Sequence, residues 1–204
     1  MNLYDRSFLL KLIILSLFTA IIILFALTPI GYLKVGIVSI TFIPVVIILG
    51  AILLGPASSA FLGFVFGATS FFQCLFGLDP FGVALFNISP SLTLILCFLP
   101  RTLMGFLSGY LFRALNKSKL NSNISTYLTA ASAPLFNSVL FITLLLLFFG
   151  NSSYIQSFVE TAGTKSMVIF AFVFFGINVV SELIICSIIG FIVSKALKKV
   201  IKNI

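Results

Sequence analysis

Three polar side chains inside long apolar stretches are the residues of this sequence best placed to do chemistry. Arg101, Asn137 and Glu182 each lie near the middle of a stretch long enough to cross a membrane. A charged side chain in hydrocarbon is costly, and it usually faces a cavity or a partner group. These three residues are therefore the first candidates for a functional site.

Asn178 extends this polar set along the last apolar stretch. It precedes Glu182 by four residues, so both lie on one helix face, with Asn178 about 6 Å nearer the outer side. Counted at about 1.5 Å per residue from the expected inner helix ends, Arg101, Asn137 and Glu182 all lie about 16 to 20 Å above the cytoplasmic surface. We expect them to share one layer.

Two interpretations of this layer stand side by side. In one, Arg101 and Glu182 form a buried ion pair that the asparagines brace and that only fixes the helix register. In the other, the layer binds a substrate: Arg101 offers a bidentate fork to a carboxylate, while Asn137 and Asn178 donate and accept hydrogen bonds. The sequence weights both equally, and they can coexist.

Composition determines the class of protein that positions these residues. Hydrophobic residues make up 61% of the chain and charged residues 8%, and the mean hydropathy is +1.30, whereas soluble domains are about 25% charged. We predict an all-α integral membrane protein, a six-helix bundle in one membrane domain (1–204), with Pro100 as a kink site. The expected spans are 8–29, 37–55, 58–77, 86–113, 126–149 and 166–194.

Lysine and arginine residues predict the orientation. If both termini are cytoplasmic, only Lys34 and Lys165 lie outside, which agrees with the positive-inside rule. The inner side then carries Arg6, Lys11, Arg113, Lys117, Lys119, Lys195, Lys198, Lys199 and Lys202. These positive charges lie at span ends, so nucleic-acid binding is not expected.

Signatures of enzymes and of metal sites are missing from the sequence. There is no histidine, no G-x-S-x-G or H-E-x-x-H motif and no phosphate-binding loop. The three cysteines (Cys74, Cys97 and Cys186) lie in different spans without metal-ligand spacing. We therefore expect no catalytic residue, no metal and no cofactor, and energy for uphill transport has to come from an ion or from another subunit.

Small residues at helical spacing form strips along three of the spans. Most such strips pack helices together, because they let two backbones approach closely. The strips consist of Ser59, Gly63 and Gly67, of Gly105 and Gly109, and of Ser16 and Ala20. The last pair is weaker: by itself it favours internal packing over docking of another membrane protein.

The connection before the fourth span adds candidates at the outer side. It contains Asp79, Phe81, Phe86 and Asn87, which could close over a pocket and offer apolar contact and hydrogen bonds. The alternative is an ordinary interfacial turn built on Asp-Pro and Gly82, and the sequence slightly favours that alternative.

Four segments, in this order, carry a family resemblance that covers most of the chain beyond residue 40. They are FIPVVIILGAILLGPASSAFLGFVFGATSF (Phe42 to Phe71), LPRTLMGFLSG (Leu99 to Gly109), APLFNSVLF (Ala133 to Phe141) and INVVSELIICSIIG (Ile177 to Gly190). Together with the size and the six spans, they resemble the substrate-binding S components of energy-coupling factor (ECF) vitamin transporters. The pattern is closest to the pantothenate-type branch.

The resemblance implies a function and partners. Such a protein captures a vitamin outside the cell and works with a transmembrane T component and two cytoplasmic ATPase subunits. A small-x-x-x-small strip on the first helix, here Ser16 and Ala20, docks the T component. The implied vitamin site contains Arg101, Asn137, Asn178 and Glu182, with Phe86 and Asn87 at its outer side.

Two other classes of function compete with vitamin capture. An ion-coupled carrier would use Arg101 and Glu182 to relay protons and would transport without ATPase subunits. A membrane assembly protein would use its glycine strips as interfaces and would gain no thermal stability from any ligand.

Overall fold

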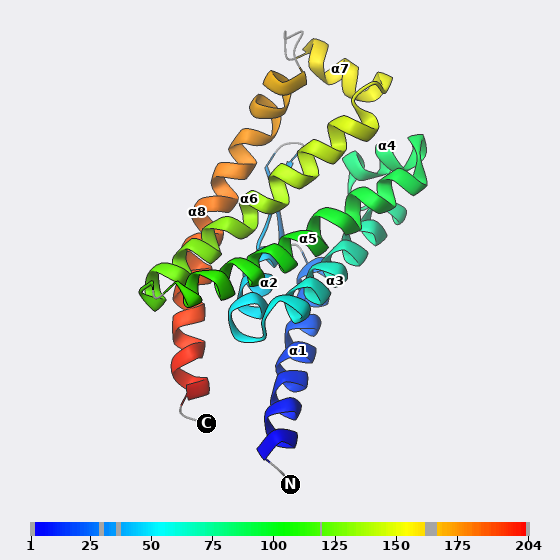
Figure 1. Ribbon diagram of the computed structural model, residues 1–204. Helices are drawn as coiled ribbons and strands as arrows, with labels where there is room; N and C mark the ends of the chain where they lie inside the picture. The colour runs from blue at the N-terminus through cyan, green and yellow to red at the C-terminus, as the bar shows by residue number, and fades with distance from the viewer. Residues whose placement is uncertain (1–2, 29–30, 36–37, 119, 162–166, 203–204) are drawn as a thin grey trace.

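The computed structural model describes residues 3–28, 31–35, 38–118, 120–161 and 167–202 as a helical bundle with one small hairpin (Figure 1). The elements in chain order are α1 (Leu3–Leu27), β1 (Tyr32–Val35), β2 (Val38–Thr41), α2 (Ile43–Leu53), α3 (Pro56–Leu75), α4 (Pro80–Ile88), α5 (Pro90–Lys117), α6 (Ser122–Phe149), α7 (Ser153–Thr161) and α8 (Met167–Lys202). The two ends of the chain lie at the same end of the bundle (Figure 1).

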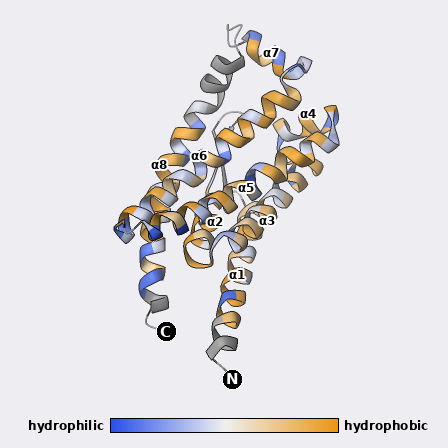
Figure 2. Cartoon of the chain, viewed as in Figure 1, coloured by the Kyte–Doolittle hydropathy of each residue, from blue (hydrophilic) through white to orange (hydrophobic). Residues whose placement is uncertain are grey.

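Five of the described helices are long and apolar enough to cross a membrane: α1, α3, α5, α6 and α8. This confirms the prediction of a helical membrane protein. Hydrophobic residues cover most of the bundle, and hydrophilic ones gather at the α5–α6 connection and along the C-terminal part of α8 (Figure 2).

The second predicted span, 37–55, was wrong in its extent. Val38–Thr41 of this span form β2, which pairs antiparallel with β1 in the register Tyr32 with Thr41, so the fold is not purely α-helical. The helix that follows, α2, has 11 residues and reaches only about half of the hydrocarbon thickness. Alternating β-branched residues before Thr41 favour a strand, and Gly55, at φ 98°, ends the α2 segment.

Other boundaries also differ from the prediction. The expected fourth span, 86–113, is divided at Ser89, whose backbone is extended because Pro90 follows it. The connection containing Asp79 is largely helical, since α4 occupies it, and the connection between the expected spans 126–149 and 166–194 contains α7. The end of the bundle away from the two chain termini, called here the outer end, therefore carries two short helices, α4 and α7 (Figure 1).

Helix α2 lies in the centre of the bundle and is buried from Ile43 to Ile52. It contacts α1, α3, α5, α6 and α8. The Ser59 hydroxyl on α3 donates a hydrogen bond to the Ile47 carbonyl at 3.0 Å, which fixes the position of α2 against α3. The short second helix thus serves as an internal support for the long ones.

Helices α3 and α5 form the most extensive interface between two elements. Glycines make it possible: a Cβ on Gly63 would collide with the Arg101 carbonyl, and one on Gly105 would collide with the Ser59 carbonyl. A Cβ on Gly67 would come within 2.8 Å of the Phe98 Cα. These strips pack α3 against α5; the sequence predicted that such strips pack helices within the bundle, but not which helices they join.

Two separate apolar clusters fill the bundle, and they are called here the inner and the outer core. The inner core surrounds α2 and comprises Phe18, Ile22, Ala26, Ile43, Val45, Val46, Ile47, Ile48, Leu49, Ile52, Leu62, Phe66, Met104, Ala130, Ala133 and Cys186. The outer core joins α4, α5, α6 and α7 and comprises Leu85, Leu96, Leu145, Phe149, Ile155 and Val159.

Candidate functional site

Arg101 owes its position to the proline before it. Pro100 has no amide hydrogen, so it leaves the Leu96 carbonyl, four residues earlier on α5, without its helical donor. The Arg101 Nη1 atom donates to that carbonyl at 2.7 Å. The guanidinium group is thereby tied to its own helix, and a buried polar group in the membrane is satisfied.

Two aromatic rings enclose the Arg101 guanidinium. Its central carbon lies 5.5 Å from the centre of the Phe66 ring on α3 and 4.9 Å from that of Phe141 on α6. Such contacts stabilise a desolvated cation. The Arg101 Nε atom is buried without a hydrogen-bond partner, so the fork is held in place while part of its donor capacity is unused.

Gly63 fixes the backbone beneath this side chain. Because a Cβ at Gly63 would collide with the Arg101 carbonyl and lie 3.1 Å from the Thr102 Cα, only glycine allows α3 to lie this close to α5. The tight helix contact thus determines how far Arg101 reaches between the helices.

Glu182 is almost completely buried, with 2% of its surface exposed. Its Oε1 atom accepts a hydrogen bond from the Thr41 backbone N–H at 3.0 Å. One helical turn further along, the Cys186 thiol donates to the Thr41 carbonyl at 3.8 Å. Helix α8 therefore holds the end of the hairpin through the backbone N–H and the carbonyl of Thr41.

The ion pair that the sequence left open is not formed between these side chains. Within the described residues, the Arg101 guanidinium donates to the Leu96 carbonyl, and the Glu182 carboxylate accepts from the Thr41 amide. The Asn178 side chain lies within hydrogen-bonding reach of the Glu182 carboxyl. No other hydrogen bond or ion pair joins either side chain to a described group. Each charged group is stabilised by a backbone partner instead.

The two asparagines place unused acceptors in the same region. Asn137 on α6 is 9% exposed, and the Oδ1 atoms of Asn137 and Asn178 are both buried without a hydrogen-bond partner. Buried polar atoms in folded proteins are nearly always bonded. The two asparagine oxygens, on the neighbouring helices α6 and α8, are therefore the atoms of this region that most require a hydrogen-bond donor.

All of these groups lie at the border between the two cores. Along α6, Asn137 lies between Ala133 of the inner core and Phe141, which packs on the outer core. Along α8, Glu182 lies between Val179, at the outer core, and Cys186 of the inner core. Arg101 likewise follows Leu96 and precedes Met104, so the polar side chains occupy one level of the bundle.

Phe86 and Asn87 lie on α4, at the outer end of the bundle. The Phe86 ring packs edge-on against Phe71 of α3 at 5.9 Å, and Phe71 lies 6.2 Å from Phe98 of α5. Asn87 is exposed. Neither side chain contacts Arg101 within the described part of the chain.

Ser16 and Ala20 are both exposed on α1, while Phe18 and Ile22, on the other side of the helix, are buried in the inner core. This strip is therefore not used for packing within the chain. It lies on a face that also carries Ile13 and Leu17, which are 62% and 56% exposed.

Several contributors to the site were missed in the sequence. Phe66, Phe141 and the Thr41 amide come from segments that are distant in the chain, and no local pattern marks them. The Leu96 carbonyl had a signal, because a proline inside a membrane helix always leaves the carbonyl four residues earlier without its donor. No group of three His, Cys, Asp or Glu side chains among the described residues could hold a metal ion.

Comparison with known proteins agrees with this architecture. The model of the family described as "ECF transporter, substrate-specific component" matches residues 10–194. The chain is also similar to the pantothenic acid transporter PanT of Lactococcus lactis subsp. cremoris (strain MG1363), with 28% identity over 138 residues, 61% of this chain and 68% of that protein.

These matches favour neither an ion-coupled carrier nor an assembly protein. They agree with the five long apolar helices of a transporter subunit that lies in the cell membrane and crosses it several times. The chain belongs to the family of substrate-specific components of ECF transporters.

Proposed function

We propose that this chain captures a small water-soluble vitamin that carries a carboxylate, with pantothenate as the first candidate. The observation that carries this proposal is the set of buried polar atoms without partners at the border of the two cores: Arg101 Nε, Asn137 Oδ1 and Asn178 Oδ1. A ligand that bonds to them supplies hydrogen bonds that no described group of the chain provides.

The types of these atoms define the ligand. The Arg101 guanidinium binds a carboxylate, and the Phe66 and Phe141 rings beside it hold the fork in place. The asparagine oxygens accept hydrogen bonds, so the ligand needs hydroxyl or amide donors. Pantothenate combines a carboxylate, an amide and hydroxyl groups on a short flexible chain, and the similar Lactococcus protein is a pantothenic acid transporter, which supports this choice.

Glu182 acts in this site as a positioning group and as an acceptor. With Oε1 it holds the Thr41 amide, and with its other oxygen it accepts from a ligand hydroxyl. Phe86 and Asn87 on α4 cover the outer side, where the ligand enters.

The same proposal assigns partners. The exposed Ser16 and Ala20 on α1 dock a T component, since small residues let a second helix approach closely. Two ATPase subunits supply the energy, because this sequence has no phosphate-binding loop.

We further propose six membrane crossings with both termini in the cytoplasm. The hairpin and α2 together make the second crossing, and the two chain ends at one end of the bundle support an even number (Figure 1). Cysteines introduced at exposed positions test this: Ser118→Cys after α5 should react with an impermeant maleimide only in opened cells, and Ser157→Cys on α7 also in intact cells. The reverse pattern would overturn the orientation.

A binding panel on the purified full-length chain tests the function. Pantothenate, riboflavin, folate, thiamine and biotin are each added, and the melting temperature and the heat of binding are measured. We expect saturable binding and a raised melting temperature with pantothenate alone. Binding of another vitamin would replace the substrate but keep the class, whereas no response to any of them would contradict vitamin capture.

A further inference from the structure

A second region with ligand-binding character lies at the opposite end of the bundle from α4 and α7. A groove of about 360 Å³ opens between the α2–α3 turn and the last turns of α5. Its polar side is formed by Arg113, Asn116 and Lys117, and its apolar side includes Leu53, Leu54 and Phe112. Both chain ends extend beyond this end of the bundle, and hydrophilic residues gather at the α5–α6 connection that follows Lys117 (Figure 2).

The two cations of this groove are available to a ligand. Arg113 and Lys117 are exposed, and neither forms a hydrogen bond or ion pair with another described side chain. The acidic side chains that the structure describes, Asp79, Glu160 and Glu182, lie in the outer half or in the polar layer. The groove therefore has a net positive charge that nothing within the described chain neutralises.

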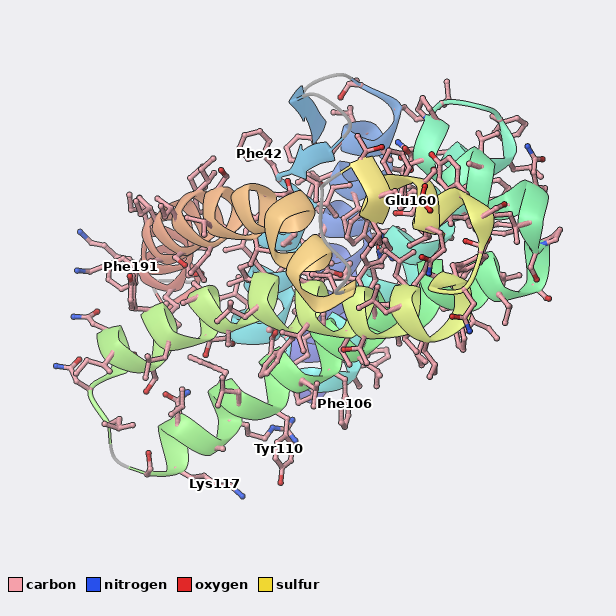
Figure 3. All side chains as sticks on the ribbon, turned by 90° about the horizontal axis from the view of Figure 1, so that it is seen from above. Phe42, Phe106, Tyr110, Lys117, Glu160 and Phe191 are labelled. Atoms are coloured by element: carbon pink, nitrogen blue, oxygen red, sulfur yellow. The ribbon has the colours of Figure 1, made fainter. Side chains whose placement is uncertain are left out.

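A stripe of exposed aromatic residues continues from the groove along α5. Phe106, Tyr110, Arg113 and Lys117 follow the spacing of one helix face. Phe106 and Tyr110 are 45% and 62% exposed, and their rings stack at 6.4 Å. Seen from above, Phe106, Tyr110 and Lys117 project from the same outer side of α5 (Figure 3).

We propose that this face binds an anionic phospholipid of the inner leaflet. The phosphate lies against Arg113, which can bind it with two parallel hydrogen bonds, and Lys117 adds a second charge. The acyl chains lie along Tyr110 and Phe106 toward the middle of the membrane. Tyrosine at this depth suits the boundary between headgroups and hydrocarbon.

Charge and position favour a lipid over a soluble anion. The cations lie at the end of a stripe that otherwise exposes large apolar side chains, which a free phosphate ion does not cover. A lipid satisfies both parts at once: its headgroup neutralises the cations, and its tails cover the aromatic rings. Each cation near an anionic surface strengthens binding by about fivefold.

Native mass spectrometry of the full-length chain in detergent tests the proposal. Phosphatidylglycerol and phosphatidylcholine with identical acyl chains are titrated separately. We expect phosphatidylglycerol to be retained preferentially, and the R113Q/K117Q double variant to bind it about 25-fold more weakly, because two cations are lost. The matched control, K195Q/K199Q, removes the same charge from exposed lysines of α8, and we expect it to bind phosphatidylglycerol as the unchanged chain does.

Four outcomes would overturn the lipid site. Equal losses in both double variants would show a diffuse attraction to basic residues, and equal retention of the two lipids would show no headgroup recognition. Displacement of phosphatidylglycerol by millimolar inorganic phosphate would show a site for free anions. A groove variant that keeps its lipid affinity but no longer assembles with a T component would assign the face to a protein partner. Vitamin binding, measured on the same samples, tests the other site independently.

Discussion

The inner and the outer core differ in their side chains and in the helices that hold them. The inner core is mostly aliphatic and surrounds α2, which is buried from Ile43 to Ile52. The outer core has six buried residues, and partly buried aromatic side chains such as Phe81, Tyr154 and Phe158 pack around them. It depends on α4 and α7, each of nine residues.

This difference matters because lipid is as apolar as the side chains. Helices in a membrane associate through close packing and hydrogen bonds, not through removal of apolar surface from water. Glycine contacts and the Ser59 hydrogen bond provide close packing around the inner core. The outer core instead depends on the short helices α4 and α7 and on tilted or edge-on contacts between aromatic rings. We infer that the inner core is the rigid half and that the ligand enters through the outer half.

The layer of Arg101, Asn137 and Glu182 lies where the rigid half ends. Arg101→Lys tests most directly whether this layer binds the ligand. Lysine keeps the charge but loses the planar fork, so we expect pantothenate binding to weaken about 10- to 100-fold, in line with the loss of one hydrogen bond to a charged group. Titration calorimetry measures the change. Arg113→Lys, the same substitution on the same helix but in the lipid groove, should leave the vitamin affinity unaltered; an unchanged affinity in Arg101→Lys would exclude the bidentate role.

Gly63→Ala tests whether close packing gives the inner half its rigidity. The added methyl collides with the Arg101 carbonyl, so α3 and α5 must separate, at a cost of about 2 to 3 kcal/mol. We expect a clearly lower melting temperature of the ligand-free chain and weaker vitamin binding, because Arg101 moves with α5.

Gly176→Ala is the matched control for this substitution. A Cβ there meets no atom of the described residues within 4 Å, so the melting temperature should stay the same or rise slightly, since alanine favours helix. If both alanine variants melt alike, the α3–α5 contact is not what stabilises the bundle.

The sequence predicted the parts of the fold that depend on local composition. Length and hydropathy identified the long helices, and spacing by four identified the glycine strips as packing surfaces, although not the helices that they join. The hairpin before α2 was missed, because an apolar run that includes Val38 and Ile40 satisfies the criterion for a membrane helix whether it forms a helix or a strand. The short helices α4 and α7 were missed because their hydropathy is interrupted by loop-forming residues.

The candidate site was predicted by residue type but not by partner. Counting residues from the helix ends indicated one layer for Arg101, Asn137 and Glu182, because rise per residue is a local property. Which groups they contact depends on helix rotation and on distant segments. The Thr41 amide reaches Glu182 only because the hairpin folds against α8, and this could not be derived from spacing within α8.

Glu182 allows a structural role to be separated from a binding role. Glu182→Ala leaves the Thr41 amide buried without an acceptor, which costs about 1 to 2 kcal/mol. Glu182→Gln keeps an oxygen for that amide, so we expect its ligand-free melting temperature to stay near that of the unchanged chain. Thermal unfolding of both variants decides the matter, and equal losses in the two would show that the negative charge itself is required.

Substitution of Tyr154 should have the smallest effect of these variants, a change in the pH dependence of the melting temperature. It tests the packing of the outer core alone. Its ring contacts Phe81 of α4 at 6.0 Å and Phe158 at 5.1 Å. Burial, and secondarily the negative charge of Asp79, raise the pKa of the Tyr154 hydroxyl above its ordinary value of about 10. The folded chain therefore holds this proton more tightly than the unfolded chain does.

The sign of the pH dependence follows from that raised pKa. The contribution of Tyr154 to stability is fully present below pH about 10 and is lost as the pH rises through the folded pKa. Tyr154→Phe keeps the ring contacts and removes the ionisation, so its melting temperature should fall less steeply between about pH 9 and pH 11. Tyr127→Phe, at an exposed site on α6, is the control. If the two phenylalanine variants show the same slope, the outer core does not sense this ionisation, and α7 packs there more loosely than its contacts with α4 imply.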